Sequence, residues 1–333
     1  MITGGYALFL VYSIYIFSNP NIVQCILRTW LQYAFPLFLV FFLLIGTDIY
    51  GFYLIPISFL ALFLPVVNFK WKMIIVGVSL FVIVASLEAR TNVVKFIMPA
   101  LFSLLFYFKK LLKSKWLSVI HVFIFVLPIM LLVLAINDTF NVFEMDKYIS
   151  TKSNTVVLNS LGADEDLLGD SRSFLYQEVI SSAIKNDYVL FGRTLARGND
   201  SVAFGSHEAE ELRTFRYERY SNEVSILNVF TWTGLIGIVL YFFIFFKATH
   251  LAIANSNSYF LKIIGLYGSF RWLTAWVEDF NRFDIMNVFI WIVIAMCYSK
   301  QFREMSDRDF AIWLNGIFKK KRLHPIKSKH ITT

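Results

Sequence analysis

The chain is poor in charged residues. Asp, Glu, Lys and Arg make up only 16% of its 333 residues, whereas about 25% is usual in a soluble domain. So little polar surface argues against a soluble bundle of buried helices, because too little would remain to coat it. Hydrophobic residues account for 57% of the chain and aromatic residues for 18%. The composition therefore indicates a membrane protein.

Cysteine is also scarce. Cys25 and Cys297 lie at or within apolar segments, so we expect neither a disulfide nor a metal site from them. The first residues, MITGGYALFL, lack the basic stretch that opens a signal peptide, and we expect no cleaved one. The pI of about 9.3 does not indicate a nucleic-acid partner, because the basic residues cluster in short loops and in the C-terminal segment.

Apolar runs, in contrast, are abundant. Runs of roughly 16–21 residues recur, enough to cross a hydrocarbon core of about 30 Å as helices. We predict an all-α, polytopic membrane protein with about nine transmembrane helices. Internal prolines do not exclude these helices, since neighbouring helices can satisfy the freed backbone groups. The predicted spans are 4–18, 30–46, 51–68, 73–87, 93–108, 117–137, 226–246, 259–277 and 284–299.

The charges of the loops set the expected orientation. Arg28, Lys70, Lys109 and Lys247 all fall on one side, together with the basic C-terminal segment, and this side is expected to be cytoplasmic. The N-terminus is then outside and the C-terminus inside. The predicted regions are transmembrane helices 1–6 in residues 1–137, a large extracytoplasmic loop in 138–225, transmembrane helices 7–9 in 226–299, and a solvated basic tail in 300–333 that touches anionic lipid.

The loop at 138–225 differs from its surroundings in charge. It holds 15 acidic and 9 basic residues, about −6, whereas the remaining chain holds 22 basic and 8 acidic residues, about +14. Inside it, Asp170 or Ser171 can cap an amphipathic helix that runs to about Asn186. Arg172 falls on the apolar stripe of that helix. The stripe consists of Leu175, Tyr176, Val179, Ile180, Ala183 and Ile184, and the polar residues Gln177, Ser181, Ser182 and Lys185 lie away from it.

The rest of the loop is predicted in two parts. A second helix is expected from His207 to Arg219, with Ser206 as its cap. The segment 191–200 between the two helices reads as irregular backbone, with two glycines and two arginines.

Several arginines are out of place for a membrane protein of this orientation. Arg90 lies at an outer helix mouth, where it can pair with Glu88 or snorkel. Arg271 lies inside a span, where a charge costs about 2.5–3.5 kcal/mol on insertion scales and needs a partner, for which Glu278 is the candidate.

The loop adds Arg172, Arg193 and Arg197, which are either solvated or part of a site. Collected at the outer mouth, these arginines would form an anion site, because guanidinium groups bind phosphate oxygens bidentately. Such a site needs no metal and no cofactor, and the loop has no His/Cys cluster with metal-ligand spacing.

A group transfer to an acceptor hydroxyl at such a site would also require a base for that hydroxyl. The candidates are Glu223, Glu178, His207 and Glu208. Glu223 is expected in the first turn of a helix, where the helix dipole alone would favour an acid by about 0.3–1 kcal/mol. His207 fits an ordinary surface histidine better than a base.

These features resemble the bacterial O-antigen polymerase and O-antigen ligase family of membrane glycosyltransferases. Ala89-Arg90 is similar to its small residue followed by Arg at an outer helix end, and Ser171-Arg172 to its loop arginine opening an amphipathic helix. Phe191-Gly192-Arg193 resembles its Gly-rich segment. Asn222-Glu223 and the later Gly234-Leu235-Ile236-Gly237 resemble its re-entry into the membrane, although ligases often place His where Glu223 stands.

The resemblance implies a transfer at the outer face of the bacterial inner membrane. The donor would be an oligosaccharide on undecaprenyl diphosphate and the acceptor the sugar end of another lipid-linked repeat. Arg90 and Arg172, with Arg193 or Arg197, would hold the diphosphate, Glu223 would assist the acceptor, and Arg271, His207 and Glu178 are further substrate-binding candidates. Membrane lipids and a chain-length regulator are the implied partners.

Other functions stay open at this point. A ligase would transfer the glycan to lipid A-core instead. A lipid-linked oligosaccharide transporter would need charged residues along a path through several spans. A sensor would use the loop as a receptor domain, but the loop lacks disulfides and alternating strand patterns.

Overall fold

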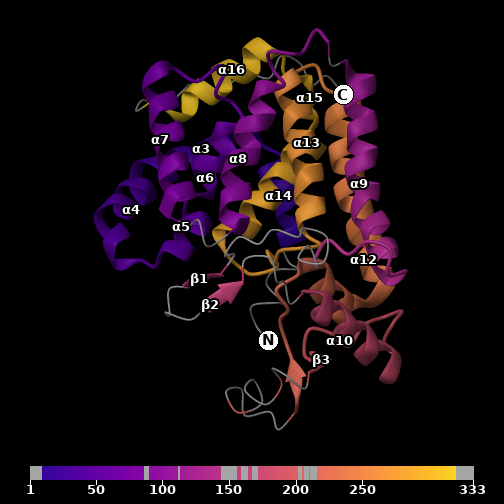
Figure 1. The fold of residues 1–333 in the computed structure, drawn as a ribbon. Helices are drawn as coiled ribbons and strands as arrows, with labels where there is room; N and C mark the ends of the chain where they lie inside the picture. Colours follow the sequence, from indigo (N-terminus) through magenta and orange to yellow (C-terminus); the bar gives the residue numbers. More distant parts are fainter. Residues whose placement is uncertain are drawn as a thin grey trace. The chain divides into compact units, whose positions relative to one another are not determined.

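The structure, a computed structural model, describes residues 10–85, 90–111, 113–143, 156–158, 164–166, 172–201, 205, 210 and 216–319. Regular structure in these residues is almost entirely helical, which agrees with the predicted all-α class (Figure 1). The chain forms two compact units. The first unit contains Met1–Leu10, Ser118–Lys247 and Gly268–Asn287, and the second contains Val11–Leu117, Ala248–Tyr267 and Val288–Thr333.

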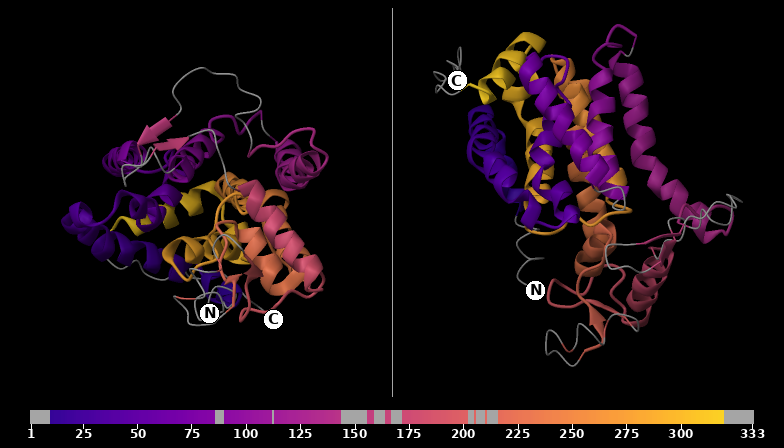
Figure 2. Two further views of the ribbon diagram at one scale, coloured as in Figure 1. Left: turned by 60° about the horizontal axis from the view of Figure 1, so that its bottom comes forward. Right: turned by 60° about the vertical axis from the view of Figure 1, so that its left-hand side comes forward.

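The helices of the N-terminal half belong mainly to the second unit. α6 packs on α7 and α8, which also pack on each other (Figure 2). The bounds are η1 (Leu10–Tyr12), α2 (Ser13–Phe17), α3 (Pro20–Thr29), η2 (Trp30–Ala34), α4 (Phe35–Phe41), η3 (Phe42–Leu44), α5 (Thr47–Tyr53), α6 (Ile55–Ala61), α7 (Phe69–Ala85), α8 (Arg90–Leu104) and α9 (Ser114–Ile136).

The C-terminal half contains the remaining helices and the few strands. The helices are α10 (Arg172–Lys185), α12 (Ser225–Ala254), α13 (Tyr259–Thr274), α14 (Ile285–Tyr298), α15 (Lys300–Glu304) and α16 (Asp307–Ile317). The strands are β1 (Val156–Leu158), β2 (Asp164–Asp166), β3 (Asn199–Asp200) and β4 (Glu218–Arg219), paired antiparallel as β1–β2 and β3–β4.

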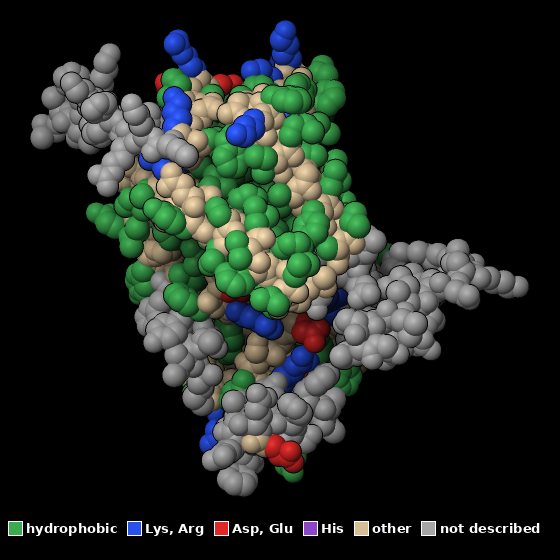
Figure 3. Space-filling model, turned by 90° about the vertical axis from the view of Figure 1, so that its left-hand side faces the viewer, with side chains coloured by type: hydrophobic (Ala, Val, Ile, Leu, Met, Phe, Trp, Pro, Cys, Tyr) green, Lys and Arg blue, Asp and Glu red, His purple; other side chains and the backbone are tan. Residues whose placement is uncertain are grey.

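Among the described residues, three helical segments are long and apolar enough to cross a membrane: Pro20–Leu44, Ser114–Ile136 and Ser225–Ala254. Thr91–Leu104 and Ile285–Tyr298 are apolar but shorter. The apolar helices indicate a membrane-embedded protein, although nine full spans are not confirmed. Hydrophobic side chains cover much of the helical face shown in Figure 3.

Two predicted spans differ from the observed helices. The span predicted at 30–46 begins earlier, because the Asn19 side chain accepts a hydrogen bond from the Asn21 backbone amide (2.9 Å) and Pro20 occupies the first turn. The span predicted at 51–68 is broken at Leu54 into α5 and α6. Every residue of α6 is buried, so its hydrophobicity reflects packing inside the second unit.

The predicted solvated tail at 300–333 is wrong for residues 300–317, which fold as α15 and α16. A capping box of Ser306 and Asp309 opens α16. Its Trp313 is buried, and the Trp313 indole donates to the Pro20 carbonyl at 2.8 Å. The Arg28 guanidinium donates to the Gly316 carbonyl at 2.7 Å. These contacts fasten α16 to α3 within the second unit.

The loop between α9 and α12 inserts its backbone into a break in α12. Gly234 has a left-handed backbone (φ 67°) within the apparent helix. The amides of Leu235 and Ile236 donate to the carbonyls of Val189 (2.9 Å) and Leu190 (3.3 Å) instead of continuing the helical pattern. The break therefore anchors the segment that carries the candidate arginines.

We predict that Gly234→Ala weakens this anchor. An added Cβ would lie 2.3 Å from the Leu190 carbonyl oxygen, and the left-handed conformation disfavours a side chain. The expected loss is about 1–3 kcal/mol of unfolding free energy, seen as a lower thermal midpoint of the purified protein in detergent. Gly77→Ala is the matched control, since no atom lies within 4 Å of its added Cβ. Equal midpoints for the two variants would contradict the assigned break.

Candidate anion-binding site

Helix α10 matches the predicted amphipathic helix and carries one wall of the site. Leu175, Val179 and Ala183 are buried as expected, whereas Ile180 and Ile184 are exposed. Ser182, which was expected on the polar face, is buried as well. Its hydroxyl accepts hydrogen bonds from the Tyr188 hydroxyl and from the Asp200 amide, both at 2.8 Å. Ser182 thus joins α10 to strand β3.

Arg193 and Arg197 converge on one buried carboxylate, that of Glu218. The Arg197 Nε donates to both carboxylate oxygens at 2.9 and 3.0 Å, and its Nη2 also contacts Oε1. The Gly198 amide donates to Oε2 at 3.2 Å. Arg193 Nη1 lies 3.6 Å from Oε1. Glu218 belongs to β4, so the predicted helix from His207 to Arg219 is wrong at its described C-terminal end.

Asp200, in β3, is the second acid of the cluster. Arg193 Nη1 donates to its Oδ1 at 2.8 Å, and Lys185 Nζ and Asn186 Nδ2 donate to its Oδ2 at 3.1 and 3.0 Å. Burial raises the pKa of Asp200, but these hydrogen bonds outweigh it and hold the pKa below its ordinary value. The Arg193 guanidinium also lies 5.0 Å from the centre of the Tyr188 ring.

These side chains line an open hollow of about 630 Å³, which we call the basic hollow. Among its lining residues four are cationic and two are acidic, an excess of two positive charges. Within the described part of the chain, Arg193 donates only through Nη1 and Arg197 only through Nε and Nη2. Their other guanidinium nitrogens can still donate to an anion. The charged lining residues are Lys185, Arg193, Arg197, Arg216, Asp200 and Glu218.

A chain of buried amides connects the hollow to the helices. Asn222 Nδ2 donates to Asn199 Oδ1 (3.0 Å), and Asn228 Nδ2 donates both to the Asn222 carbonyl (2.9 Å) and to Asp279 Oδ1 (3.1 Å). Burial raises the pKa of Asp279, against the opposing effect of donors that include the Arg282 side chain. Buried polar groups paired in this way fix the register of loop and helices.

Arg271 is buried, with 2% of its side chain exposed, and its pairing with Glu278 is confirmed at 3.7 Å. The pair does not lie along one continuous helix. Helix α13 ends at Thr274, and a turn brings Glu278 back. Arg271 also lies 4.9 Å from the centre of the Phe280 ring. Its contacts are therefore those of a structural pair within the first unit.

Two of the acids predicted as candidate bases, Glu223 and Glu178, lie within the described residues. Glu223 precedes α12 by two residues, so it is not in the first turn of that helix. Its side chain is 57% exposed and pairs with Arg219 at 3.3 Å. Glu178, on α10, accepts from Asn199 Nδ2 at a long 3.5 Å.

The structure does not bring Arg172 into the basic hollow. Arg172 opens α10, whereas Lys185, which lines the hollow, ends it, roughly 20 Å further along a helix of 1.5 Å per residue. The charge of Arg172 opposes the burial that raises the pKa of Tyr176, so this guanidinium is near the phenol.

Arg90 is the first residue of α8, in the second unit. That Arg90 and Arg172 hold the same diphosphate stays a prediction. His207 and Glu208 lie outside the described residues. Lys95, on α8, was missed although a buried cation in an apolar run is itself a signal. Its ammonium lies 4.4 Å from the centre of the Phe52 ring.

No group of three or more His, Cys, Asp or Glu side chains that could hold a metal occurs among the described residues. Asp164-Glu165-Asp166 is an Asp-x-Asp motif, and its backbone forms β2. Comparison of the chain with protein-family models, with curated proteins and with solved structures found no match.

We predict that the basic hollow stabilises the fold through Glu218. Burial raises the pKa of Glu218, but hydrogen bonds from Arg197 and the Gly198 amide outweigh it, so the pKa lies below its ordinary value. This stabilisation is complete above the unfolded-state pKa and is lost as the pH falls through the folded-state value. Glu218→Gln should cost about 3 kcal/mol at pH 7. The difference from the wild type should shrink below pH 4.5.

Glu223→Gln is the control for this prediction, because an exposed pair contributes under about 1 kcal/mol. The thermal midpoints of the three proteins are measured from about pH 3 to about pH 8, a range that contains the ordinary pKa values of carboxyl groups. A Glu218→Gln protein as stable as Glu223→Gln at neutral pH would show that the buried carboxylate does not organise the loop.

Proposed function

We propose that the chain is a membrane glycosyltransferase that polymerises oligosaccharide repeats. It would transfer a glycan from undecaprenyl diphosphate to an acceptor sugar at the outer face of the inner membrane, in O-antigen, capsule or exopolysaccharide synthesis. One observation carries the proposal: the basic hollow, with its excess of two positive charges, lies in the segment between the apolar helices α9 and α12. An anionic lipid head group is a fitting ligand for such a place.

The hollow suits a diphosphate leaving group. As the bond between the sugar carbon and the diphosphate oxygen breaks, its electron pair passes to the diphosphate. The open guanidinium nitrogens of Arg193 and Arg197 would stabilise that charge. The ion pairs to Asp200 and Glu218 hold both arginines in place before the ligand arrives, so little reorganisation is needed.

The acceptor hydroxyl oxygen forms the new bond to the sugar carbon and gives up its proton. Glu223 is our candidate base because its carboxylate is exposed and uses only Oε1 in its pair with Arg219. Arg219 is adjacent in sequence to Glu218, so the base and the hollow are joined through β4. This scheme uses side chains of the first unit and requires no metal.

The proposal predicts loss of polymer from two substitutions in the hollow. Arg216→Ala removes an exposed cation that lines the hollow. Arg193→Lys can keep the charge facing Asp200 but loses the open guanidinium donors. Each should lower the transfer rate, by up to about 100-fold for Arg193→Lys. In a deletion strain complemented with each variant, polymer ladders on gels should shorten towards single repeats.

Arg308→Ala, on the exposed surface of α16, is the control and should leave the ladder intact. Membrane levels of every variant are measured in parallel, so that loss of protein is separated from loss of transfer. Arg90→Ala and Arg172→Ala test the remaining arginines predicted from sequence. A full-length ladder from Arg193→Lys and Arg216→Ala would remove the hollow from the mechanism.

A further inference from the structure

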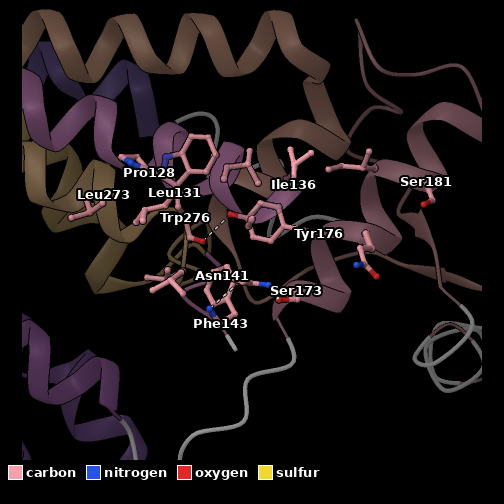
Figure 4. A pocket seen from close by; sticks show the side chains of 16 residues that line it. Pro128, Leu131, Ile136, Asn141, Phe143, Ser173, Tyr176, Ser181, Leu273 and Trp276 are labelled. Atoms are coloured by element: carbon pink, nitrogen blue, oxygen red, sulfur yellow. Dashed lines mark hydrogen bonds between the residues drawn. The ribbon is translucent and has the colours of Figure 1, made fainter. Parts of the chain in front are cut away.

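An apolar pocket of about 310 Å³ lies in the first unit, apart from the basic hollow. As Figure 4 shows, it is lined by α9 and residues 141–143 that follow it, by α10, and by the end of α13 with the turn that follows. Side chains on its walls include Pro128, Leu131, Ile136, Tyr176, Ile180 and Trp276. Its volume is at the lower end of the range of about 300–1,000 Å³ found for ligand pockets.

Two pairs of polar groups on the pocket walls are hydrogen-bonded to each other, whereas the buried Trp276 Nε1 has no hydrogen-bond partner among the described residues. The Tyr176 hydroxyl donates to the Trp276 carbonyl at 2.8 Å, and Asn141 Nδ2 donates to the Ser173 hydroxyl at 2.9 Å (Figure 4). These pairs leave mostly carbon atoms facing the space. A sugar would lose hydrogen bonds to water on entering such a pocket, whereas a hydrocarbon chain would lose none.

The pocket lies beside a helix that is suited to face lipid. α9 is one of the three segments that can cross a membrane. Its side chains that do not line the pocket include exposed apolar ones, such as Ile129, Met130 and Val133. A hydrocarbon chain could therefore pass from the bilayer into the pocket along α9 without crossing water.

Helix α10 joins the pocket to the basic hollow. Ser181 lines the pocket and Lys185 lines the hollow, one helical turn or roughly 6 Å apart. An apolar pocket next to a positively charged hollow matches an amphiphile that has an anionic head and a hydrocarbon chain.

We propose that the apolar pocket holds the head-proximal part of the polyprenyl chain of the lipid-linked substrate. This inference rests on the proposed function, which assigns the phosphate to the basic hollow. The pocket would fix the position of the lipid along α10, so that its phosphate reaches the arginines.

Photolabelling tests the inference without measuring transfer. The full chain in nanodiscs is exposed to polyprenyl phosphate that carries a diazirine in the isoprene next to the phosphate. Labelled residues are then identified by mass spectrometry. We expect labels on the pocket walls of α9 and α10. Ala135→Phe and Ser181→Phe, which fill the pocket from opposite walls, should each lower this labelling at least fivefold.

Val133→Phe is the matched control, because Val133 is exposed on α9 and does not line the pocket, and its labelling should stay within twofold of the wild type. Equal labelling of filled and unfilled proteins would overturn the inference. So would stronger labelling of the pocket by a diazirine phosphatidylglycerol, which would make it a site for ordinary bilayer lipid. Pocket labelling in a protein that makes no polymer would uphold the inference and remove only the proposed function.

Discussion

A carboxylate taken out of water must be surrounded by donors or positive charge, and this constraint organises the segment between α9 and α12. The Glu218 side chain is only 5% exposed. It draws Arg197, the Gly198 amide and Arg193 together across a β3–β4 ladder from residues about twenty positions earlier. The hollow keeps an excess of two positive charges because four cationic side chains line it with only two acids, Glu218 and Asp200, and that excess is the basis of the proposed anion site.

The sequence was most informative where one local signal was enough. Uniform apolarity located α9, and a polar start followed by an apolar stripe located α10. The break in α12 at Gly234 depends on carbonyls of Val189 and Leu190, which no local pattern reveals. Helices α15 and α16 were missed because their basic composition outweighed a readable signal, the Ser306-Asp309 capping box.

The site was only partly predictable for the same reason. Arg193 and Arg197 were identified by their place in an irregular, glycine-containing segment, but their acidic partners were not, since Glu218 was assigned to a helix. Lys185 and Arg216 join the hollow only through the fold. Arg172 was placed correctly at the start of α10, yet the spacing could not show that the hollow forms at the other end of that helix.

The proposed binding of a lipid diphosphate in the basic hollow is tested most simply by direct binding. Farnesyl diphosphate serves as a soluble probe for the purified full chain, titrated in EDTA at low and high salt. The account predicts saturable binding that weakens with salt, falls at least fivefold in Arg216→Ala, and is unchanged in Arg308→Ala. Binding that is absent, or equally strong in both variants, would contradict it.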